Sequence, residues 1–345
     1  MVRLTEFNRV SLKRYRSYLM IAPPSGQTEC RGLISRVHRF ARRVRVSELT
    51  HQEFSYDEAF SRNVGWVTAA EQQFLRTKRV AIAGLGGVGG VHLLTLARLG
   101  IGQFSVADFD RYSLANFNRQ VGASMRTLDK SKSQVMSEMA LDINPELNLR
   151  VFEQGVTEGN LESFLDGVDL YVDGLDFFAF KARKLVFDAC ARRRIPAITV
   201  APLGLGAALL SFLPGRMSFE EYFRWEGCDD AEMAVRFLVG LSPAFLHGPY
   251  LVEPAAVDLA RRRGPSTTVA CQLCSGIVGA EALKILLGRG EVLAAPWGMH
   301  FDAYRNKMVR TWRPWGNANP LQRVLMAVAR RRYAGSIRAA RGARS

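Results

Sequence analysis

The segment from Arg79 to Gly100 constrains the fold more than any other part of the sequence. Its first part, "RVAIAG", is a short apolar run that ends in glycine, which is typical of a buried strand. Its last part, "VGGVHLLTLARLG", has the apolar spacing of a helix, and Gly100 supplies a stop signal. The glycine-rich turn "GLGGVG" lies where the two parts meet. A strand, a tight turn and a helix in this order predict the beginning of a β-α-β unit.

Strand-like runs and helical stretches continue to alternate after this turn. We predict strands over residues 79–84, 103–108, 147–154, 168–174, 196–201 and 207–213, and helices over 69–75, 88–100, 131–143, 161–165 and 179–193. Alternation of this kind predicts an α/β fold with a Rossmann-like, doubly wound, mostly parallel sheet. Beyond Pro214 the pattern changes to helices and loops, with a late hairpin expected over residues 299–305 and 307–312.

The distribution of charge divides the chain into three parts. The formal net charge is +15, and Lys and Arg outnumber Asp and Glu by 11 to 2 in residues 1–46 and by 9 to 0 in residues 310–345, against 27 to 30 between them. We therefore expect a basic, partly disordered extension over residues 1–50, a domain over 51–310 and a basic tail over 311–345. The basic ends suit solvated tails or contacts with an acidic partner.

The composition also bears on the compartment. We find no run that approaches the roughly 18 apolar residues of a membrane helix, so we expect no membrane partner and a cytoplasmic location. The five cysteines are too few and too scattered for a disulfide framework in a chain of 345 residues.

The glycine turn has the spacing of a nucleotide-binding site. Gly84, Gly86 and Gly89 match the dinucleotide fingerprint, and Asp108 follows Gly84 by 24 residues. Glycines allow a phosphate to approach closely, and the first N–H groups of a helix attract an anion. Asp108 ends the second predicted strand, where a carboxylate reaches ribose hydroxyls. The turn predicts an adenosine nucleotide without choosing between NAD, FAD and ATP, and a turn that binds no ligand remains the alternative.

A polar cluster downstream of the turn narrows this choice. It comprises Asp110, Asn116, Arg119 and Lys132, none of which has an evident role in hydride transfer. Arg119 and Lys132 can neutralise phosphate charge, Asn116 can donate to a phosphate oxygen, and a further acid could hold magnesium. Together with the extra glycine at Gly87, the cluster favours a triphosphate.

These motifs resemble those of the ThiF/MoeB family of ubiquitin-activating-like (E1-like) adenylyltransferases. The resemblance covers residues 55–310 and rests on "GLGGVG", "DFDRYSLANFNRQ", "KSK" and "DGLD", which occur in the family's order and spacing. It implies that Asp108 binds the ribose and that Asn116, Arg119 and Lys132 lie around the phosphates. It further implies that Asp176 holds magnesium and is needed for adenylation.

The resemblance also implies a partner subunit and a reaction. Arg62 in "FSRN" matches an arginine that reaches into the ATP site of the other subunit, which implies a homodimer. The implied reaction is the ATP-dependent activation of a carboxylate, at the C-terminus of a ubiquitin-like or sulfur-carrier protein or of a peptide. Its products are an acyl-adenylate and pyrophosphate, and its cofactors are ATP and Mg²⁺.

Three departures from the family's pattern indicate a divergent branch. The chain has one CxxC pair, Cys271 and Cys274 ahead of a strong helix, where a closed zinc site needs four ligands, so we expect no structural zinc. Phe177 replaces the asparagine that usually follows the catalytic aspartate. Cys228 lies in about the region of a transfer cysteine, and the neighbouring acids Asp229 and Asp230 oppose its ionisation.

Three other functions remain open on the sequence alone. Adenylation or dehydration could be directed at a modified tRNA, with the basic ends holding phosphates. A catalytically silent nucleotide-binding module would account for Phe177 and the missing zinc pairs. An NAD-dependent oxidoreductase would account for the glycine fingerprint and Asp108, although no catalytic His or Tyr constellation is visible.

Overall fold

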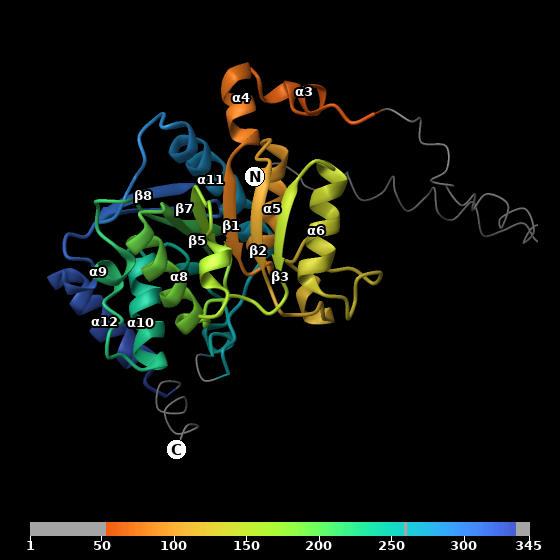
Figure 1. Ribbon diagram of the computed structural model, residues 1–345. Coiled ribbons are helices and arrows are strands. Elements are labelled where there is room, and N and C mark those ends of the chain that lie inside the picture. Colours follow the sequence, from red (N-terminus) through yellow and green to blue (C-terminus); the bar gives the residue numbers. More distant parts are fainter. Residues whose placement is uncertain (1–52, 259–260, 336–345) are drawn as a thin grey trace, which may run out of the picture. The chain divides into compact units, whose positions relative to one another are not determined.

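One eight-stranded sheet organises the part of the chain that the structure, a computed structural model, describes: residues 53–258 and 261–335. Its strand order is β3-β2-β1-β4-β5-β6-β7-β8 (Figure 1). The strands are β1 (Arg79–Ala83), β2 (Gln103–Ala107), β3 (Asn148–Phe152), β4 (Leu170–Asp173), β5 (Ala197–Leu203), β6 (Gly206–Phe212), β7 (Trp297–Asp302) and β8 (Lys307–Trp312). The basic extension expected over residues 1–50 lies outside the described residues.

The sheet is parallel in one half and antiparallel in the other. β3, β2, β1, β4 and β5 run parallel, and β6, β7 and β8 continue the sheet as antiparallel strands. Helices connect the parallel strands, whereas a tight turn at Gly204, with φ at +63°, joins β5 to β6. The prediction of a doubly wound, mostly parallel sheet with a late hairpin is confirmed.

Helices cover both faces of the sheet. The α-helices of the described residues are α3 (Tyr56–Ala59), α4 (Ala69–Arg76), α5 (Gly89–Arg98), α6 (Lys132–Ile143), α7 (Leu161–Phe164), α8 (Phe180–Arg193), α9 (Phe219–Phe223), α10 (Asp230–Leu241), α11 (Thr268–Leu287) and α12 (Pro320–Arg332). Side chains of α5, α6 and α11 share one hydrophobic cluster with the sheet, and those of α7, α8, α9 and α10 share another. In Figure 1, α8, α9, α10 and α12 lie together on one side.

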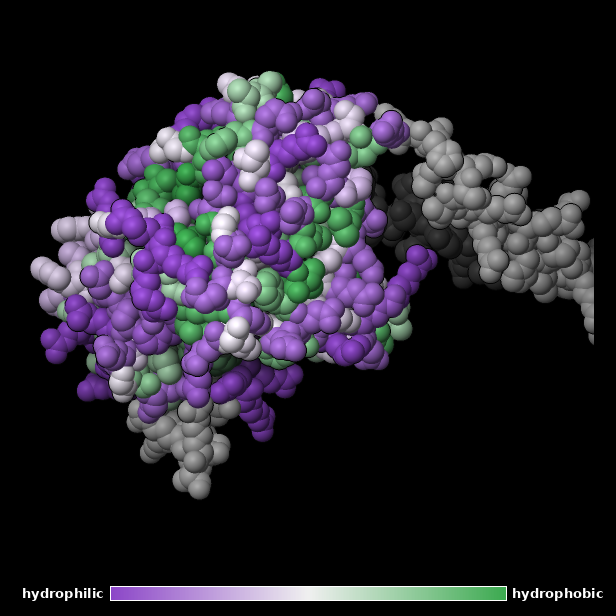
Figure 2. Space-filling view, in the orientation of Figure 1, coloured by the Kyte–Doolittle hydropathy of each residue, from purple (hydrophilic) through white to green (hydrophobic). Residues whose placement is uncertain are grey.

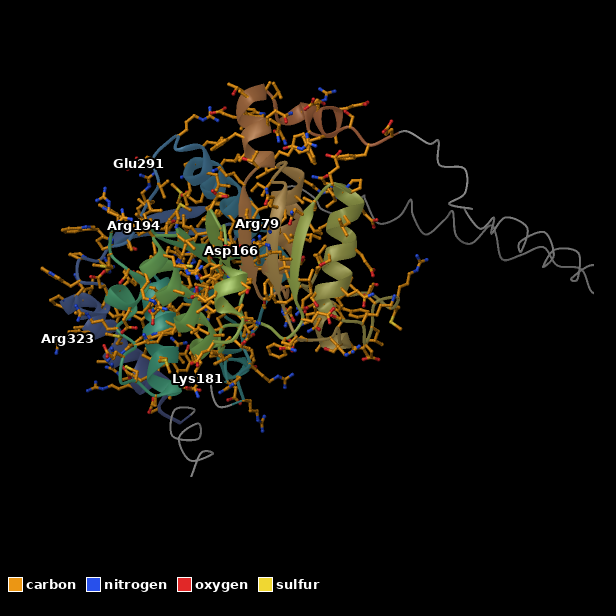
Figure 3. All side chains as sticks on the ribbon, viewed as in Figure 1. Arg79, Asp166, Lys181, Arg194, Glu291 and Arg323 are labelled. Carbon is orange, nitrogen blue, oxygen red and sulfur yellow. The ribbon has the colours of Figure 1, made fainter. Side chains whose placement is uncertain are left out.

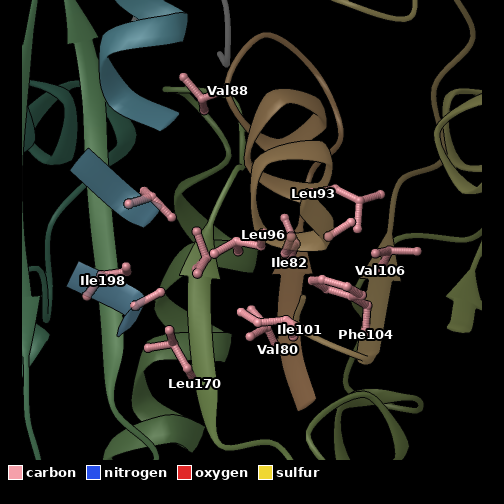
Figure 4. Close-up of a cluster of buried hydrophobic side chains, with 14 of the residues drawn as sticks. Val80, Ile82, Val88, Leu93, Leu96, Ile101, Phe104, Val106, Leu170 and Ile198 are labelled. Carbon is pink, nitrogen blue, oxygen red and sulfur yellow. The ribbon is translucent and has the colours of Figure 1, made fainter. Parts of the chain in front are cut away.

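The first cluster fixes the strand, turn and helix that carry the glycines. Val80 and Ile82 of β1, Phe104 of β2 and Leu93 and Leu96 of α5 are all fully buried in it (Figure 4). Every residue of β1 is buried, as expected for a central parallel strand covered on both faces. This packing holds the end of β1 and the beginning of α5 in a fixed relation.

The second cluster is dominated by aromatic rings. Phe187 of α8 stacks on Phe219 of α9 with ring centroids 4.3 Å apart, and Trp225 and Phe237 pack around them. Such contacts add about 0.5–1.5 kcal/mol per pair to the burial of the rings. Large aromatic side chains thus pack on the face of the sheet that α7, α8, α9 and α10 cover.

Helix α11 differs from the expectation that no segment is apolar enough for a membrane. By length and composition alone, Thr268–Leu287 could cross a bilayer. In the fold it packs against α5, β5 and β6, and half of its most apolar window is buried. Its apolar composition is that of a core helix, because more than one side of the helix contacts the domain.

The surface and the C-terminal segment complete the fold. In Figure 2 hydrophilic residues predominate on the visible face, with separate hydrophobic patches between them. The segment after β8, which we expected to be a tail, carries α12, and this helix packs against α10 through Met326 and Val235. Arg330 of α12 also forms an ion pair with Glu232 of α10 at 2.6 Å.

Candidate functional site

The glycine turn packs directly against the turn that follows β4. A Cβ atom at Gly84 would overlap with the carbonyl oxygen of Gly174, and one at Gly89 would overlap with that of Gly84. Gly84 also has φ at +83°, a conformation that favours glycine. These glycines are therefore required by backbone contacts within the protein. The turns after β1 and β4 consequently form a single edge, at the carboxyl ends of the parallel strands.

Gly86 and Gly87, in contrast, face side chains. A Cβ at Gly86 would lie 3.5 Å from Nε2 of Gln120, and one at Gly87 would lie 3.6 Å from Cγ of Arg119 and 3.2 Å from Sγ of Cys271. The part of the turn that precedes α5 is thus bordered by an amide, a guanidinium side chain and the first turns of α11. The helix N-terminus of α5 adds unpaired N–H groups to this edge.

Asp108 is held against the glycine turn by backbone N–H groups. Its Oδ2 accepts from Leu85 N–H at 2.6 Å and its Oδ1 from Asp110 N–H at 2.8 Å, and the residue is 8% exposed. Burial raises the pKa of Asp108, and these two backbone hydrogen bonds oppose the rise. Each carboxylate oxygen retains capacity for a further donor, such as a ribose hydroxyl.

Lys132 and Asp110 form an ion pair beside Asp108. Lys132 is the first residue of α6, and its Nζ donates to Oδ2 of Asp110 at 2.9 Å. The Lys132 side chain is 7% exposed, whereas that of Asp110 is 53% exposed. Asp110, predicted to contact the nucleotide, is thus seen holding the ammonium group of Lys132.

Asn116 and Arg119 make local hydrogen bonds in the segment after Asp108. The Oδ1 of Asn116 accepts from Ser113 N–H at 3.0 Å, which closes a short 3₁₀ helix, Leu114–Asn116. Nη1 of Arg119 donates to Ala115 O at 2.9 Å and to Oδ1 of Asn118 at 3.0 Å. Arg119 lies at the glycine turn, with donors that a phosphate could recruit.

Gln120 is a site residue that the sequence interpretation did not single out. It is 7% exposed, it lies beside Gly86, and its Oε1 has no hydrogen-bond partner among the described residues. An unsatisfied buried acceptor costs about 1–3 kcal/mol, so a ligand donor at this place would be favoured. The only sequence signal was its position directly after Arg119.

Asp176 lies on the loop after β4. Its side chain is exposed, and its Oδ1 accepts from Phe178 N–H at 3.0 Å. Because this loop continues from Gly174, which contacts Gly84, Asp176 belongs to the same edge of the sheet as the glycine turn. The structure thus places Asp108 and Arg119 against the glycine turn, Lys132 beside Asp108, and Asp176 two residues after Gly174, which contacts Gly84.

Arg62 does not join this group within one chain. It is exposed on a 3₁₀ helix, Ser61–Asn63, and Nδ2 of its neighbour Asn63 donates to Arg98 O at 3.2 Å. Arg98 ends α5, whose first residue is Gly89 of the turn, so about 15 Å of helix separates the two ends. An Arg62 that serves this site would have to come from a second copy.

Phe177 and Cys228 are partly buried, whereas Cys271 and Cys274 are buried. Phe177 packs against Phe237 at 5.2 Å between ring centroids. Cys271 and Cys274 lie inside α11 and are fully buried, which corrects the expectation that they precede the helix, because α11 begins at Thr268. Burial is the main cause that raises the pKa of Cys228, followed by Glu232 and Glu220, while Asp229 is a weaker influence.

The donors at this edge fit a nucleoside triphosphate with magnesium. Arg119 and the amide Nε2 of Gln120 border the glycine turn, and Lys132 lies beside Asp108. Asp108 supplies a carboxylate where a ribose hydroxyl can bind. Within residues 53–258 and 261–335 there is no group of three or more His, Cys, Asp or Glu side chains that could hold a metal. Magnesium commonly takes one or two carboxylates and completes its shell with phosphate and water, so Asp176 alone suits it.

Comparison with known proteins identifies the family of the chain. Residues 60–324 match the model of the ThiF family. The chain is 34% identical over 131 residues to the tRNA threonylcarbamoyladenosine dehydratase of Haemophilus influenzae, covering 38% of this chain and 49% of that protein. It is 33% identical over 143 residues to the sulfur carrier protein ThiS adenylyltransferase of Escherichia coli, covering 41% and 56%.

A solved structure shares the fold. The structure of E. coli MccB with ATP has a TM-score of 0.52 and 21% identity, and the match covers 70% of this chain and 65% of that chain. The chain spans about half the length of the curated relatives it matches. These relatives support the fold and the family, and leave the substrate of this chain to be argued from its own residues.

Proposed function

Because the chain belongs to the ThiF family, we propose that it is an ATP-dependent adenylyltransferase that activates a carboxylate as an acyl-adenylate and releases pyrophosphate. The observation that supports the proposal is that four charged residues lie at the edge of the sheet where the glycine turn is found. They are Asp108, Arg119, Lys132 and Asp176. A site for hydride transfer would need only the first of them.

The chemistry follows from the charges. A carboxylate substrate is already ionised at neutral pH, so its attack on the α-phosphorus needs no general base. The obstacle is the approach of one anion to another, and the site meets it by placing Lys132 and Arg119 beside the phosphate-binding turn. Magnesium, held at Asp176, would neutralise further phosphate charge. Asp108 orients the nucleotide through the ribose, so that the attacking oxygen, phosphorus and leaving oxygen can align.

We propose that the active form is a homodimer. Arg62 is exposed and lies at the far end of α5 from the glycine turn, so it can act only at the site of a second copy. A guanidinium added from the partner would raise the positive charge around the phosphates in the transition state. Arg62→Ala should then lower activity without altering nucleotide binding by an isolated chain.

For the substrate we propose the terminal carboxylate of a small sulfur-carrier or ubiquitin-like protein, or of a peptide, in the cytoplasm. The ThiS adenylyltransferase among the relatives supports the first, and the structure of MccB with MccA, a fold neighbour, supports the second.

The test is ATP–pyrophosphate exchange by the purified full chain, with a panel of carrier proteins and peptides that end in a free carboxylate. We expect exchange that depends on one class of substrate and disappears in Asp176→Ala. Asp166→Ala is a matched control, since Asp166 is exposed and pairs with Arg150 outside the site (Figure 3). Unchanged exchange in Asp176→Ala would refute the assignment, and absence of exchange with every substrate would favour a silent module. Tight NADH binding without ATP binding would favour an oxidoreductase.

A second candidate is the same chemistry directed at a modified tRNA. Its support is the identity to the H. influenzae dehydratase and the 11 to 2 excess of basic over acidic residues in 1–46. Removal of residues 1–46 should then weaken tRNA binding and flatten its salt dependence. Binding that is unaffected by the truncation would exclude this candidate.

A further inference from the structure

A buried arginine lies directly beneath the Asp176 loop. Arg183 of α8 is 2% exposed, and its Nε donates to Oδ2 of Asp173 at 2.8 Å. Its Nη2 donates to Leu175 O at 2.8 Å and to Asp176 O at 3.0 Å, and its Nη1 donates to Phe177 O at 3.1 Å. One guanidinium group therefore gathers three successive carbonyls of the loop.

The surroundings of Arg183 leave it no freedom to move. Its guanidinium lies over the ring of Phe237 at 4.5 Å, and Thr199 Oγ1 donates to the same oxygen of Asp173 at 2.9 Å. Asp173 is itself 3% exposed, so its charge is neutralised by Arg183 inside the core. Asp173 thus neutralises the positive charge of Arg183, and the buried guanidinium group is not available to bind a ligand itself.

The consequence is a fixed orientation for Asp176. With the carbonyls of residues 175–177 directed at the guanidinium, the Asp176 side chain remains on the exposed side of the loop. We propose that Arg183 is a positioning residue that holds the Asp176 carboxylate where it can bind the magnesium ion of the nucleotide. This inference rests on the proposed function for the identity of the ion, whereas the control of the loop by Arg183 does not.

The arrangement requires arginine in particular. A planar guanidinium offers five N–H donors in a rigid fork, which suits a carboxylate on one edge and three carbonyls on the others. A lysine ammonium offers three donors from one point and would leave buried carbonyls without partners. Lys181, two residues earlier in α8, is exposed, and residues two apart do not share one face of a helix, so it cannot take over.

The experiment compares Arg183→Lys and Arg183→Met with Thr199→Val in the full chain. Thr199→Val removes one donor to Asp173 but leaves the hydrogen bonds between Arg183 and the loop carbonyls. It is therefore the matched control for effects that come only from a loss of stability. Two quantities are measured: amide hydrogen exchange at Phe178 and Ala179 without nucleotide, and the affinity for the ATP analogue AMPCPP with magnesium chloride and with EDTA.

In both Arg183 variants we expect exchange at Phe178 and Ala179 to rise about tenfold or more, since the loop opens locally. The gain in AMPCPP affinity on adding magnesium should fall about 10-fold or more, as when an outer partner of a metal ligand is removed. Affinity in EDTA should stay within about twofold, because the glycine turn is untouched, and Thr199→Val should leave all three measurements as in the wild type.

The outcomes separate this proposal from the proposed function. Wild-type loop exchange in Arg183→Lys, which preserves charge and is the variant expected to fold, would overturn the control of the loop. Faster exchange with an unchanged magnesium gain would overturn the role in metal binding. If magnesium does not raise the AMPCPP affinity of the wild type, the proposed function fails. The amide hydrogen exchange still decides whether Arg183 positions the loop.

Discussion

The turns after β2 and β4 use the same sequence feature in opposite ways. The end of each strand carries two acids: Asp108 and Asp110 follow β2, whereas Asp173 is the last residue of β4 and Asp176 lies three positions later. At β2 the first acid faces the glycine turn, and backbone N–H groups hold it. At β4 the first acid is buried in the core, where Arg183 neutralises it, and the second acid is exposed to solvent. An acid at the end of a parallel strand can therefore contribute to the site or to the stability of the fold. Which of the two it does depends on whether a neighbouring helix places a buried cation beside it.

The largest expected effect is a difference in the free energy of unfolding between variants of Asp173 and Asp108. Asp173→Asn leaves the Arg183 guanidinium buried without a counter-charge, which should reduce the free energy of unfolding by about 3–5 kcal/mol. Asp108→Asn loses one hydrogen bond of a group that is not ion-paired and should cost about 1 kcal/mol. Urea denaturation of both variants measures the difference, and equal losses would contradict the contrast.

The next effect concerns catalysis on the β2 side. Lys132→Met should lower the rate of ATP–pyrophosphate exchange about 100-fold, because a cation beside the transferring phosphate is lost. Lys130→Met removes an exposed charge two residues away and should leave the rate within about twofold. If both substitutions have similar effects, the ammonium of Lys132 is not placed at the phosphates.

Acidic pH should lower the free energy of unfolding through His92, which lies in α5, the helix that follows the glycine turn. Burial lowers the pKa of His92 in α5 from 6.5 to about 3, so the folded state resists its protonation. Stability from this neutral imidazole is fully present above pH 6.5 and is lost as the pH falls from 6.5 towards 3. Between pH 7 and pH 5 the wild type should lose about 2 kcal/mol more of its free energy of unfolding than His92→Leu does.

Each protein is compared with itself at pH 7 and pH 5. Any loss of stability that the leucine side chain causes equally at both pH values therefore cancels. Burial also lowers the pKa of His300 in β7 to about 4 and lowers the pKa of His247, and the loss that remains in His92→Leu is attributed to these two imidazoles. Equal losses in the wild type and in His92→Leu would show that His92 does not contribute.

The smallest effect tests the residue that the sequence interpretation missed. Gln120→Leu removes a buried amide group beside Gly86, whose Oε1 has no partner among the described residues, and should weaken AMPCPP binding about tenfold without lowering stability. Gln134→Leu, on the exposed face of α6, is the control and should bind as the wild type does. Isothermal titration measures both affinities, and unchanged binding by Gln120→Leu would remove this side chain from the site.

The sequence was sufficient for features that depend on neighbouring residues. The glycine turn, the alternation of strands and helices, the late hairpin and the position of Asp108 at a strand end all follow from local spacing. The beginning of α11 was placed too late, since Thr267 caps the helix ahead of the cysteines.

Other features depend on contacts between distant parts of the chain. The pairing of Arg183 with Asp173 requires α8 to pack on β4 at one register, and no local pattern reveals which of Lys181 and Arg183 turns inward. The antiparallel direction of β6 depends on the tight turn at Gly204. The burial of Gln120 depends on its approach to Gly86, 34 positions earlier in the chain.

The most direct test of the central claim is a crystal structure of the full chain with AMPCPP and magnesium. The claim is that the carboxyl edge of β1, β2 and β4 is shaped to carry the charge of three phosphates. It predicts a ribose hydroxyl on Asp108 and phosphate oxygens within hydrogen-bond distance of Lys132 and Arg119. A nucleotide bound elsewhere, with Lys132 still paired to Asp110 and Arg119 still on Ala115, would contradict it.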